Sequence, residues 1–367
     1  MQDKRISTRQ FTMLVIMYTI GYGILILPHF LTLTARQQAW QIVVIGFPVI
    51  AYVAYLYFRL FRKHPRLDLF ELMDHILGKW ISRVFIIILL WMILFVSLTS
   101  LLSLIEGFIT TEIMTETPSW TFALMFMFII VVGIKLGVQT ISKANEMLFY
   151  IFNVFFFTLI LTVLPKVRSD PLAIKFIPMF EVGWQPMLVT FLNYFSAVGA
   201  PLIILLAFFP KEIEKPETAT RSFVLGTSIG GVYLLIILLC CIGVLGYDLT
   251  STAIYPSYNL AQRINIADFF TRIEVLMAAS WFITIYIKLI FYYKFSVRGL
   301  SHLLNIQNQQ LLAVPLAITP LILSFYIYPD ISSLFKFEIT IWTYASIAFL
   351  FGIPLLLLTV GKLRRMI

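Results

Sequence analysis

The sequence predicts an all-α polytopic membrane protein of about ten transmembrane helices, built as a five-plus-five inverted repeat. Three observations predict this fold class. The composition is 60% hydrophobic and only 12% charged, about half the charged fraction of a soluble domain. Long apolar runs recur along the whole chain between short charged segments. The first and sixth of these runs, which begin the two halves, are both interrupted by small residues and a proline.

Each apolar run is about 18 residues or longer, enough for a helix that crosses a bilayer. The predicted spans lie near residues 11–33, 41–61, 81–105, 120–137, 141–164, 184–209, 223–247, 269–297, 311–328 and 339–360. We treat 1–367 as a single integral membrane domain with a first repeat of about 8–165 and a second of about 184–361. An odd number of spans in each half makes the second half insert upside down.

The formal net charge of +9 is interpreted as an orientation signal and not as a sign of nucleic-acid binding. With the N-terminus inside, 19 of the 27 lysines and arginines fall in inward segments and 7 in outward ones, and Lys288 lies within a span. Cytoplasmic loops carry an excess of these residues. We therefore expect both termini to be cytoplasmic and the chain to be surrounded by lipid.

The first span contains Gly21, Tyr22 and Gly23, with Pro28 one turn later. A broken helix exposes backbone groups that cost several kcal/mol each when they are unpaired in lipid. Such breaks form the binding elements of secondary transporters, where half-helix ends face a substrate near the midplane. The alternative is that the two glycines only let another helix pack closely.

The sixth span carries a second break, with Asn193, Tyr194 and Ser196 followed by Gly199 and Pro201. Proline removes an amide donor, and glycine lowers the cost of leaving helical geometry. Free amides at half-helix N-termini suit a carboxylate, and free carbonyls at half-helix C-termini suit an ammonium. The two breaks therefore predict a site for an amino-acid-sized zwitterion, although a sugar or another small polar molecule also fits.

Lys288 lies in an otherwise apolar and aromatic part of the eighth span. A charge there marks a functional site by default, but its position near the inner end of the span also allows the side chain to snorkel to the interface. Both explanations stay open. If the side chain points inward, it is a tethered charge that substitutes for a bound ion.

The inward segment Arg62–Lys79 alternates charged and apolar residues, and helical spacing puts most of the apolar ones on one face. This pattern predicts a short amphipathic helix at the membrane interface. A docking surface for a soluble partner is the alternative.

Nothing in the sequence supports an enzyme. The four histidines are scattered, and no nucleophile, phosphate loop or metal cluster accompanies them. Cys240 and Cys241 are adjacent within an apolar run, so we expect them to be packing residues. We predict no cofactor, no metal and no catalytic residue.

The order of several short motifs resembles the spore germination permease family, the B subunits of nutrient germinant receptors. These motifs are Gly21, Gly23, Leu25, Leu27 and Pro28 in the first span, Leu77–Trp80 before the third, Thr117 and Pro118 before the fourth, and Pro256 ahead of Arg272.

The resemblance implies a LeuT-like fold of the amino acid-polyamine-organocation (APC) superfamily in the spore inner membrane or the bacterial cell membrane. It also implies a subunit that senses a nutrient germinant with an A subunit and a lipoprotein C subunit. The family's ligand pocket then adds Met92 and Val96 from the third helix and Lys288 from the eighth. An amino-acid or ion-coupled transporter, and a scaffold that binds no ligand, are the alternatives.

Overall fold

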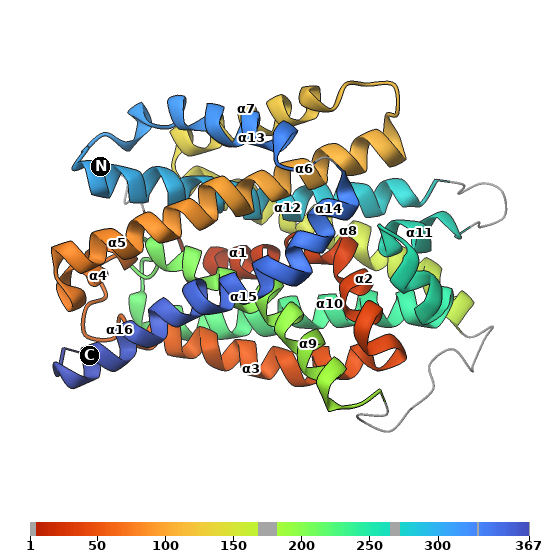
Figure 1. Cartoon of the computed structure of the whole chain (residues 1–367), viewed down its shortest axis with the longest axis horizontal. Helices are drawn as coiled ribbons and strands as arrows, with labels where there is room; N and C mark the ends of the chain where they lie inside the picture. The colour runs from red at the N-terminus through yellow and green to blue at the C-terminus, as the bar shows by residue number, and fades with distance from the viewer. Residues whose placement is uncertain (1–4, 168–181, 265–271, 329, 367) are drawn as a thin grey trace.

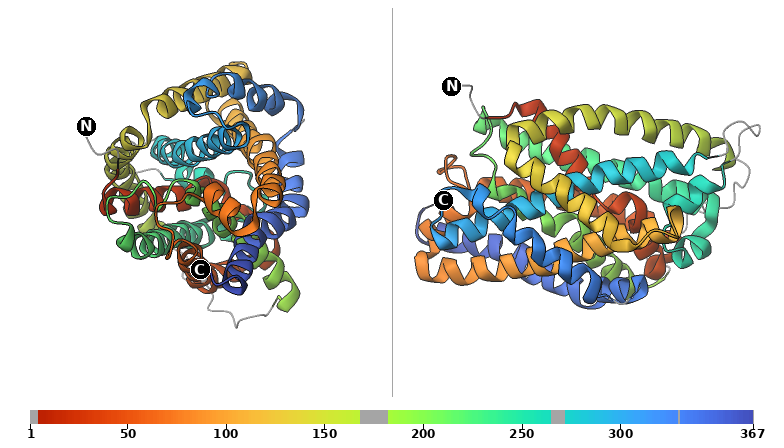
Figure 2. Two further views of the ribbon diagram at one scale, coloured as in Figure 1. Left: turned by 90° about the vertical axis from the view of Figure 1, so that its left-hand side faces the viewer. Right: turned by 90° about the horizontal axis from the view of Figure 1, so that it is seen from above.

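The computed structural model describes residues 5–167, 182–264, 272–328 and 330–366. Regular structure in these ranges is helical, and an isolated bridge between Ile6 and Ile213 is the β-type contact found there. The helices form an elongated bundle, and both ends of the chain lie at the same end of it (Figure 1). Views along and across the bundle show the long helices running side by side (Figure 2).

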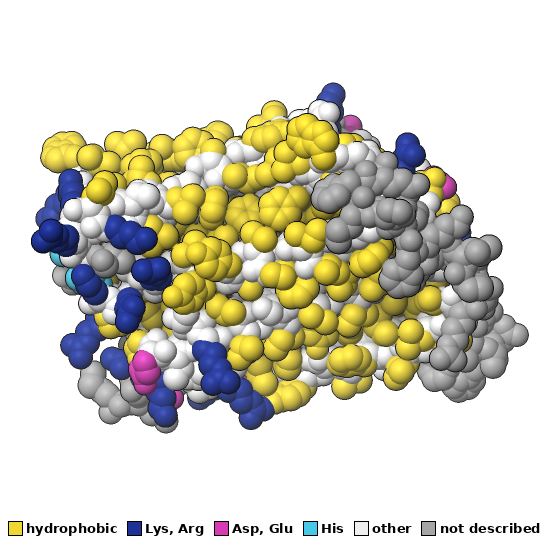
Figure 3. Space-filling view, turned by 90° about the horizontal axis from the view of Figure 1, so that it is seen from below, with side chains coloured by type: hydrophobic (Ala, Val, Ile, Leu, Met, Phe, Trp, Pro, Cys, Tyr) yellow, Lys and Arg dark blue, Asp and Glu magenta, His cyan; other side chains and the backbone are white. Residues whose placement is uncertain are grey.

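The sides of the bundle carry large apolar side chains. Trp80, Phe128 and Tyr326 are 82%, 70% and 80% exposed. Figure 3 shows hydrophobic side chains over the middle of one face and lysine and arginine side chains gathered at the end where the termini lie. Apolar surface of this extent marks contact with lipid, and the chain is an integral membrane protein.

The first half contains five traverses. The first consists of α1 (Thr8–Ile20) and α2 (Gly23–Ala35), and the chain then turns through η1 (Arg36–Gln38) into α3 (Ala39–Arg59). The third traverse runs through α5 (Lys79–Leu90), η2 (Trp91–Ser97), α6 (Leu98–Phe108) and η3 (Ile109–Ile113). The fourth and fifth are α7 (Ser119–Leu136) and α8 (Val138–Val167).

The second half begins with the sixth traverse, α9 (Trp184–Tyr194), η4 (Phe195–Gly199) and η5 (Ala200–Ala207). The seventh and eighth are α10 (Pro216–Thr252) and α12 (Glu274–Leu304), with α11 (Pro256–Gln262) between them. The ninth follows η6 (Gln309–Leu311) and consists of η7 (Pro315–Ala317) and α13 (Ile318–Tyr326). The tenth is α14 (Ile331–Phe337), η8 (Glu338–Trp342), α15 (Thr343–Ser346), η9 (Ile347–Phe351) and α16 (Gly352–Leu363).

Eight helical stretches of the described chain are each long and apolar enough to cross a membrane. One of them, Gly23–Arg59, joins α2 to α3, which turn back on each other (Figure 1). It thus contributes the outer half of the first traverse and all of the second. The ninth traverse, Pro315–Tyr326, is a shorter apolar helix. The predicted ten-helix fold with broken helices 1 and 6 is confirmed.

The amphipathic segment forms α4 (Leu69–Leu77), which starts with a capping box between Asp68 and Glu71. Its apolar side chains are buried in the protein, and α4 packs against α5, α16 and η5. Asp68 also accepts a hydrogen bond from Arg298 of α12 at 3.0 Å. The helix is present as predicted, but its apolar face contacts the bundle and not lipid, because α16 and α12 return to the same end.

Two glycines of α10 hold α1 in place. A Cβ added to Gly226 would lie 2.7 Å from Cβ of Val15, and one added to Gly230 would lie 2.7 Å from Cβ of Thr19. Side chains larger than hydrogen would push the two helices apart. This contact fixes the end of α1 just before the first break.

Candidate ligand site at the two broken helices

The first break lies between α1 and α2. Gly21 has φ +45° and ψ −128°, a region that residues with a Cβ rarely adopt. The amide of Leu25 bonds to the carbonyl of Tyr22 at 3.3 Å, which leaves the Gly21 carbonyl without its helical donor. The hydroxyl of Thr284 in α12 donates to that carbonyl at 2.7 Å. No side-chain hydrogen bond caps the N-terminus of α2 at Gly23, and the first amides of a helix have no partner within the helix.

The second break is a π-helical turn, η4, followed by Pro201. In a regular helix the amide at position 201 would bond to the carbonyl of Ala197, and proline has no amide to donate. The Lys288 ammonium donates to this carbonyl at 3.1 Å. The hydroxyl of Tyr18 in α1 donates to the carbonyl of Pro201 at 2.8 Å. Side chains from α1 and α12 therefore satisfy the backbone of the second break.

Lys288 is the residue that joins the two breaks. Its side chain is 1% exposed, and its Nζ lies 4.5 Å from the ring centroid of Tyr22 and 5.6 Å from that of Tyr18. A Cβ at Gly21 would lie 2.6 Å from Cδ of Lys288, so this glycine makes room for the lysine stem. The side chain points inward, and the alternative in which it snorkels to the interface does not describe this structure.

Glu338 is a charged neighbour that the sequence analysis missed. It interacts electrostatically with Lys288, and its side chain is partly exposed. The sequence predicts a tenth span near residues 339–360, but the helix starts at Ile331, about 12 Å earlier at 1.5 Å per residue. Asp330 accepts a hydrogen bond from the Ser333 amide at 2.7 Å. Such an N-cap pattern is visible in sequence and could have located the true helix start.

Asn193 and Ser196 form a second polar cluster with Thr343 of the tenth traverse. The Thr343 hydroxyl donates to Asn193 Oδ1 at 2.9 Å and lies 3.3 Å from the Ser196 hydroxyl. The Asn193 Nδ2 is buried and has no hydrogen-bond partner among the described residues. An unused amide donor next to the second break suits an acceptor group of a ligand.

Three predicted site residues make packing contacts at the broken helices. A Cβ on Gly23 would meet Leu234 of α10, at 3.3 Å. The ring of Tyr194 lies against Gly46 of α3, 2.6 Å from the position of a Cβ there, and Gly199 packs against the Phe195 ring. These residues shape the packing of the broken helices but are not among the contacts of Lys288.

Met92 and Val96 line an apolar crevice of about 410 Å³ between η2 and the tenth traverse. Phe337, Trp342 and Tyr328 form the opposite wall of this crevice. The third-helix residues thus contact the tenth traverse, although η2 also packs against α12. The crevice forms only where two distant helices meet, so the residues of either helix alone do not indicate it.

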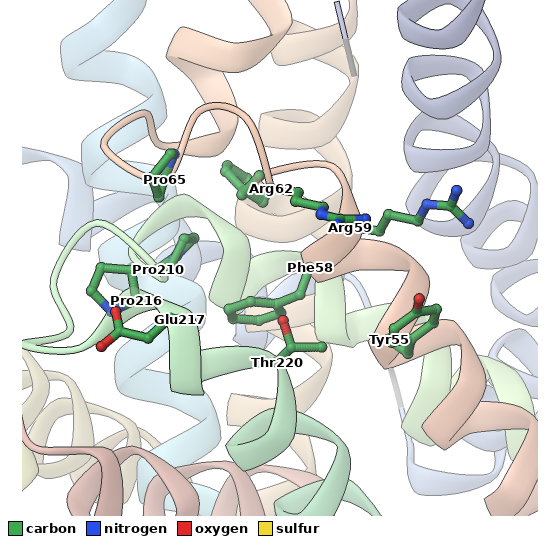
Figure 4. A pocket seen from close by; sticks show the side chains of 10 residues that line it. Tyr55, Phe58, Arg59, Arg62, Pro65, Pro210, Pro216, Glu217 and Thr220 are labelled. Carbon is green, nitrogen blue, oxygen red and sulfur yellow. The ribbon is translucent and has the colours of Figure 1, made fainter.

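A larger pocket, of about 540 Å³, lies between the end of α3 and the start of α10 (Figure 4). Arg59 and Arg62 from the α3 side and Glu217 from the α10 side line it, and Phe58 lies at its centre. None of the predicted site residues lines this pocket. Residues of the two broken helices do not line this pocket, so its size alone does not identify it as the ligand site.

Ten traverses, two broken helices and a site between helices 1, 6 and 8 define a LeuT-like transporter fold. The solved structure of Mhp1, a nucleobase-cation-symport-1 family transporter in a closed conformation with bromovinylhydantoin bound, superposes with a TM-score of 0.67. The match covers 99% of this chain and 80% of Mhp1 at 13% sequence identity. This similarity establishes the fold and nothing about the substrate.

The chain belongs to the spore germination protein family, whose profile matches residues 5–331. Spore germination protein YndE of Bacillus subtilis is 26% identical, with 98% of this chain and 97% of that protein covered. Spore germination protein KB of the same organism is 24% identical, covering 90% and 87% of the two chains. The family is one of permease-like membrane proteins and not a family of enzymes.

Proposed function

We propose that this chain is the membrane subunit of a nutrient germinant receptor and binds a small polar germinant, an amino acid, at broken helices 1 and 6. The observation that carries the proposal is the position of Lys288, whose ammonium meets the freed carbonyl of Ala197 beside Gly21. Family membership and the transporter-like fold support it. Ligand-driven rocking between the two helix bundles would signal to partner subunits.

The chemistry of the site favours a zwitterion. Uncapped amides at the start of α2 and the Nδ2 of Asn193 offer donors to a carboxylate. Glu338 offers the matching negative charge for an ammonium, and it is partly exposed. A ligand that carries both groups would complete hydrogen bonds that the described residues leave open. A sugar would use the donors but carries no ammonium that could meet Glu338.

Lys288 acts in this proposal as a tethered cation. Ion-coupled proteins of this architecture bind sodium between the first and eighth helices, where carbonyls of a broken helix meet hydroxyls of the eighth. Here Thr284 meets Gly21 and Lys288 meets Ala197. A tethered ammonium in this position would hold helices 1, 6 and 8 together without a bound sodium ion.

The basic end of the bundle, which carries both termini (Figures 1 and 3), would face the cytoplasm, that is, the spore core. The spore inner membrane is then the location. The family resemblance supports an A subunit and a lipoprotein C subunit as partners.

An amino-acid or ion-coupled transporter is the second candidate, and the likeness to Mhp1 favours it. Reconstitution of the purified chain in liposomes with a panel of labelled amino acids separates the possibilities. Saturable binding without uptake supports the receptor, and uptake supports the transporter. If the chain shows no binding and no uptake, both candidates are overturned, and the result supports a scaffold that only holds its partner subunits.

A further inference from the structure

A second polar cavity lies away from Lys288, between α6 and the tenth traverse. It has a volume of about 240 Å³. The elements that line it, the end of α6 and the start of α14, lie toward the end of the bundle opposite the termini (Figure 1). Hydroxyl, carboxyl and apolar side chains share its surface, and no lysine, arginine or histidine lines it. The lining includes Glu106, Ser103, Thr110, Ser324, Tyr328 and Leu334.

Glu106 is the buried charge of this cavity, since its side chain is only 6% exposed. Its Oε1 accepts a hydrogen bond from the Ser324 hydroxyl at 2.8 Å, and Oε2 has no hydrogen bond to the described residues. A hydroxyl is neutral and cannot balance a carboxylate, and a charge within a transmembrane segment is costly unless it is paired. Within the described chain, Glu106 forms no ion pair.

The walls around Glu106 suit a small cation. The Ser103 hydroxyl donates to the Ser324 carbonyl at 2.9 Å, and the Tyr328 hydroxyl lies 2.8 Å from the Ser100 hydroxyl. Each of these hydroxyl oxygens keeps a lone pair that can face a bound cation. A water occupies about 30 Å³ in the liquid, so the cavity exceeds the size of a bare metal ion. Leu334 and its apolar neighbours can contact a short alkyl group.

We propose that this cavity binds a small monovalent cation, with Glu106 as its counter-charge and the surrounding hydroxyls as further ligands. The chemistry is shared by the ammonium head of a short primary amine and by a monovalent metal ion. The site is separate from the Lys288 site, and the proposal does not rest on the proposed germinant function.

The test uses the full chain in nanodiscs and follows thermal unfolding while methylammonium, Na⁺ or K⁺ replaces N-methylglucamine, a bulky polyhydroxylated cation that serves as the reference. A ligand that binds the folded state raises the unfolding free energy by RT ln(1 + [L]/Kd), and the unfolding temperature rises with it. We expect the unfolding temperature to rise with the logarithm of the cation concentration above Kd, and Glu106→Gln should shift this rise to concentrations about tenfold to a hundredfold higher, the usual effect of losing a hydrogen bond to a charged group.

Glu112→Gln is the matched control, because Glu112 lies nearby in η3 but does not line the cavity; it should bind as the unmodified chain does. If Glu106→Gln does not fold, Ser324→Ala should weaken binding by removing a cavity hydroxyl. Preference for methylammonium identifies an amine site, and preference for Na⁺ or K⁺ a metal-ion site. The proposal is overturned if no cation stabilises the chain, or if neither Glu106→Gln nor Ser324→Ala changes the response.

Discussion

The two broken helices free a backbone carbonyl by different means. The first break depends on Gly21, whose φ of +45° ends the helical hydrogen-bond series without any proline at the break. The second keeps right-handed backbone through a π-helical turn and instead loses one donor at Pro201. The first break is thus a change of backbone conformation, whereas the second is a missing amide.

The same helix meets both breaks. Thr284 and Lys288 are one turn apart on α12, and residues at this spacing lie on one face. Thr284 donates to Gly21 of the first break and Lys288 to Ala197 of the second. The two halves therefore share a carbonyl that is freed from its helical donor, but not the local structure that frees it.

Gly21→Val is expected to have the largest effect, because it forces a branched side chain into the conformation on which the first break depends. The Cβ would lie 2.6 Å from Cδ of Lys288 and 3.0 Å from the Tyr18 carbonyl oxygen. We expect a loss of about 3 kcal/mol or more in unfolding free energy and no measurable amino-acid binding. Thermal unfolding and ligand titration in nanodiscs measure the two effects.

Gly23→Ala is the control within the same break. Its Cβ would meet the flexible end of the Leu234 side chain at 3.3 Å, and this glycine has no positive φ. Equal losses in the two variants would contradict the special position of Gly21.

Lys288→Met should rank second, because it removes the ammonium that joins the breaks while keeping most of the side-chain volume. The Ala197 carbonyl would be left without its donor, at a cost of about 1–3 kcal/mol. We expect amino-acid binding to fall at least tenfold in a titration. Lys294→Met, on the same helix with its Nζ over the Phe208 ring at 5.4 Å, should bind normally. Unchanged binding by Lys288→Met would remove Lys288 from the site.

Pro201→Ala restores an amide to the second break and tests whether the missing donor is what matters there. That amide can compete with Lys288 for the Ala197 carbonyl. We expect the germinant affinity to fall several-fold while the unfolding free energy changes by about 1 kcal/mol or less. Pro48→Ala, at an exposed position within α3, should leave the affinity unchanged. Wild-type affinity in Pro201→Ala would show that the second break does not depend on the lost donor.

Thr284→Val should have the smallest effect, since it removes one hydroxyl and keeps the shape of the side chain. Its hydrogen bond to the Gly21 carbonyl is 2.7 Å long, and its loss should cost about 1 kcal/mol. Denaturant unfolding measures this loss, and Thr284→Ser should recover most of it. If Thr284→Ser does not recover stability, the first break is stabilised by packing of the Thr284 methyl group and not by its hydroxyl.

The class of protein and the location of both breaks could be identified from the sequence alone. Hydropathy, glycine and proline report properties of the local chain, and these do not depend on which helices become neighbours. This is why Gly21 and Pro201 could be identified from their own surroundings. The motif order likewise indicated the family that the comparisons establish.

The directions of side chains and the contacts between distant groups depend on the tertiary structure. Lys288 could reach water or the interior from the same position, and the inward direction follows from the carbonyl that Pro201 leaves free. Glu338 and the Glu106 cavity depend on a tenth traverse that starts earlier than its apolar run and packs against α6. Pairings between distant helices are set by packing, for which a single sequence carries no periodic signal.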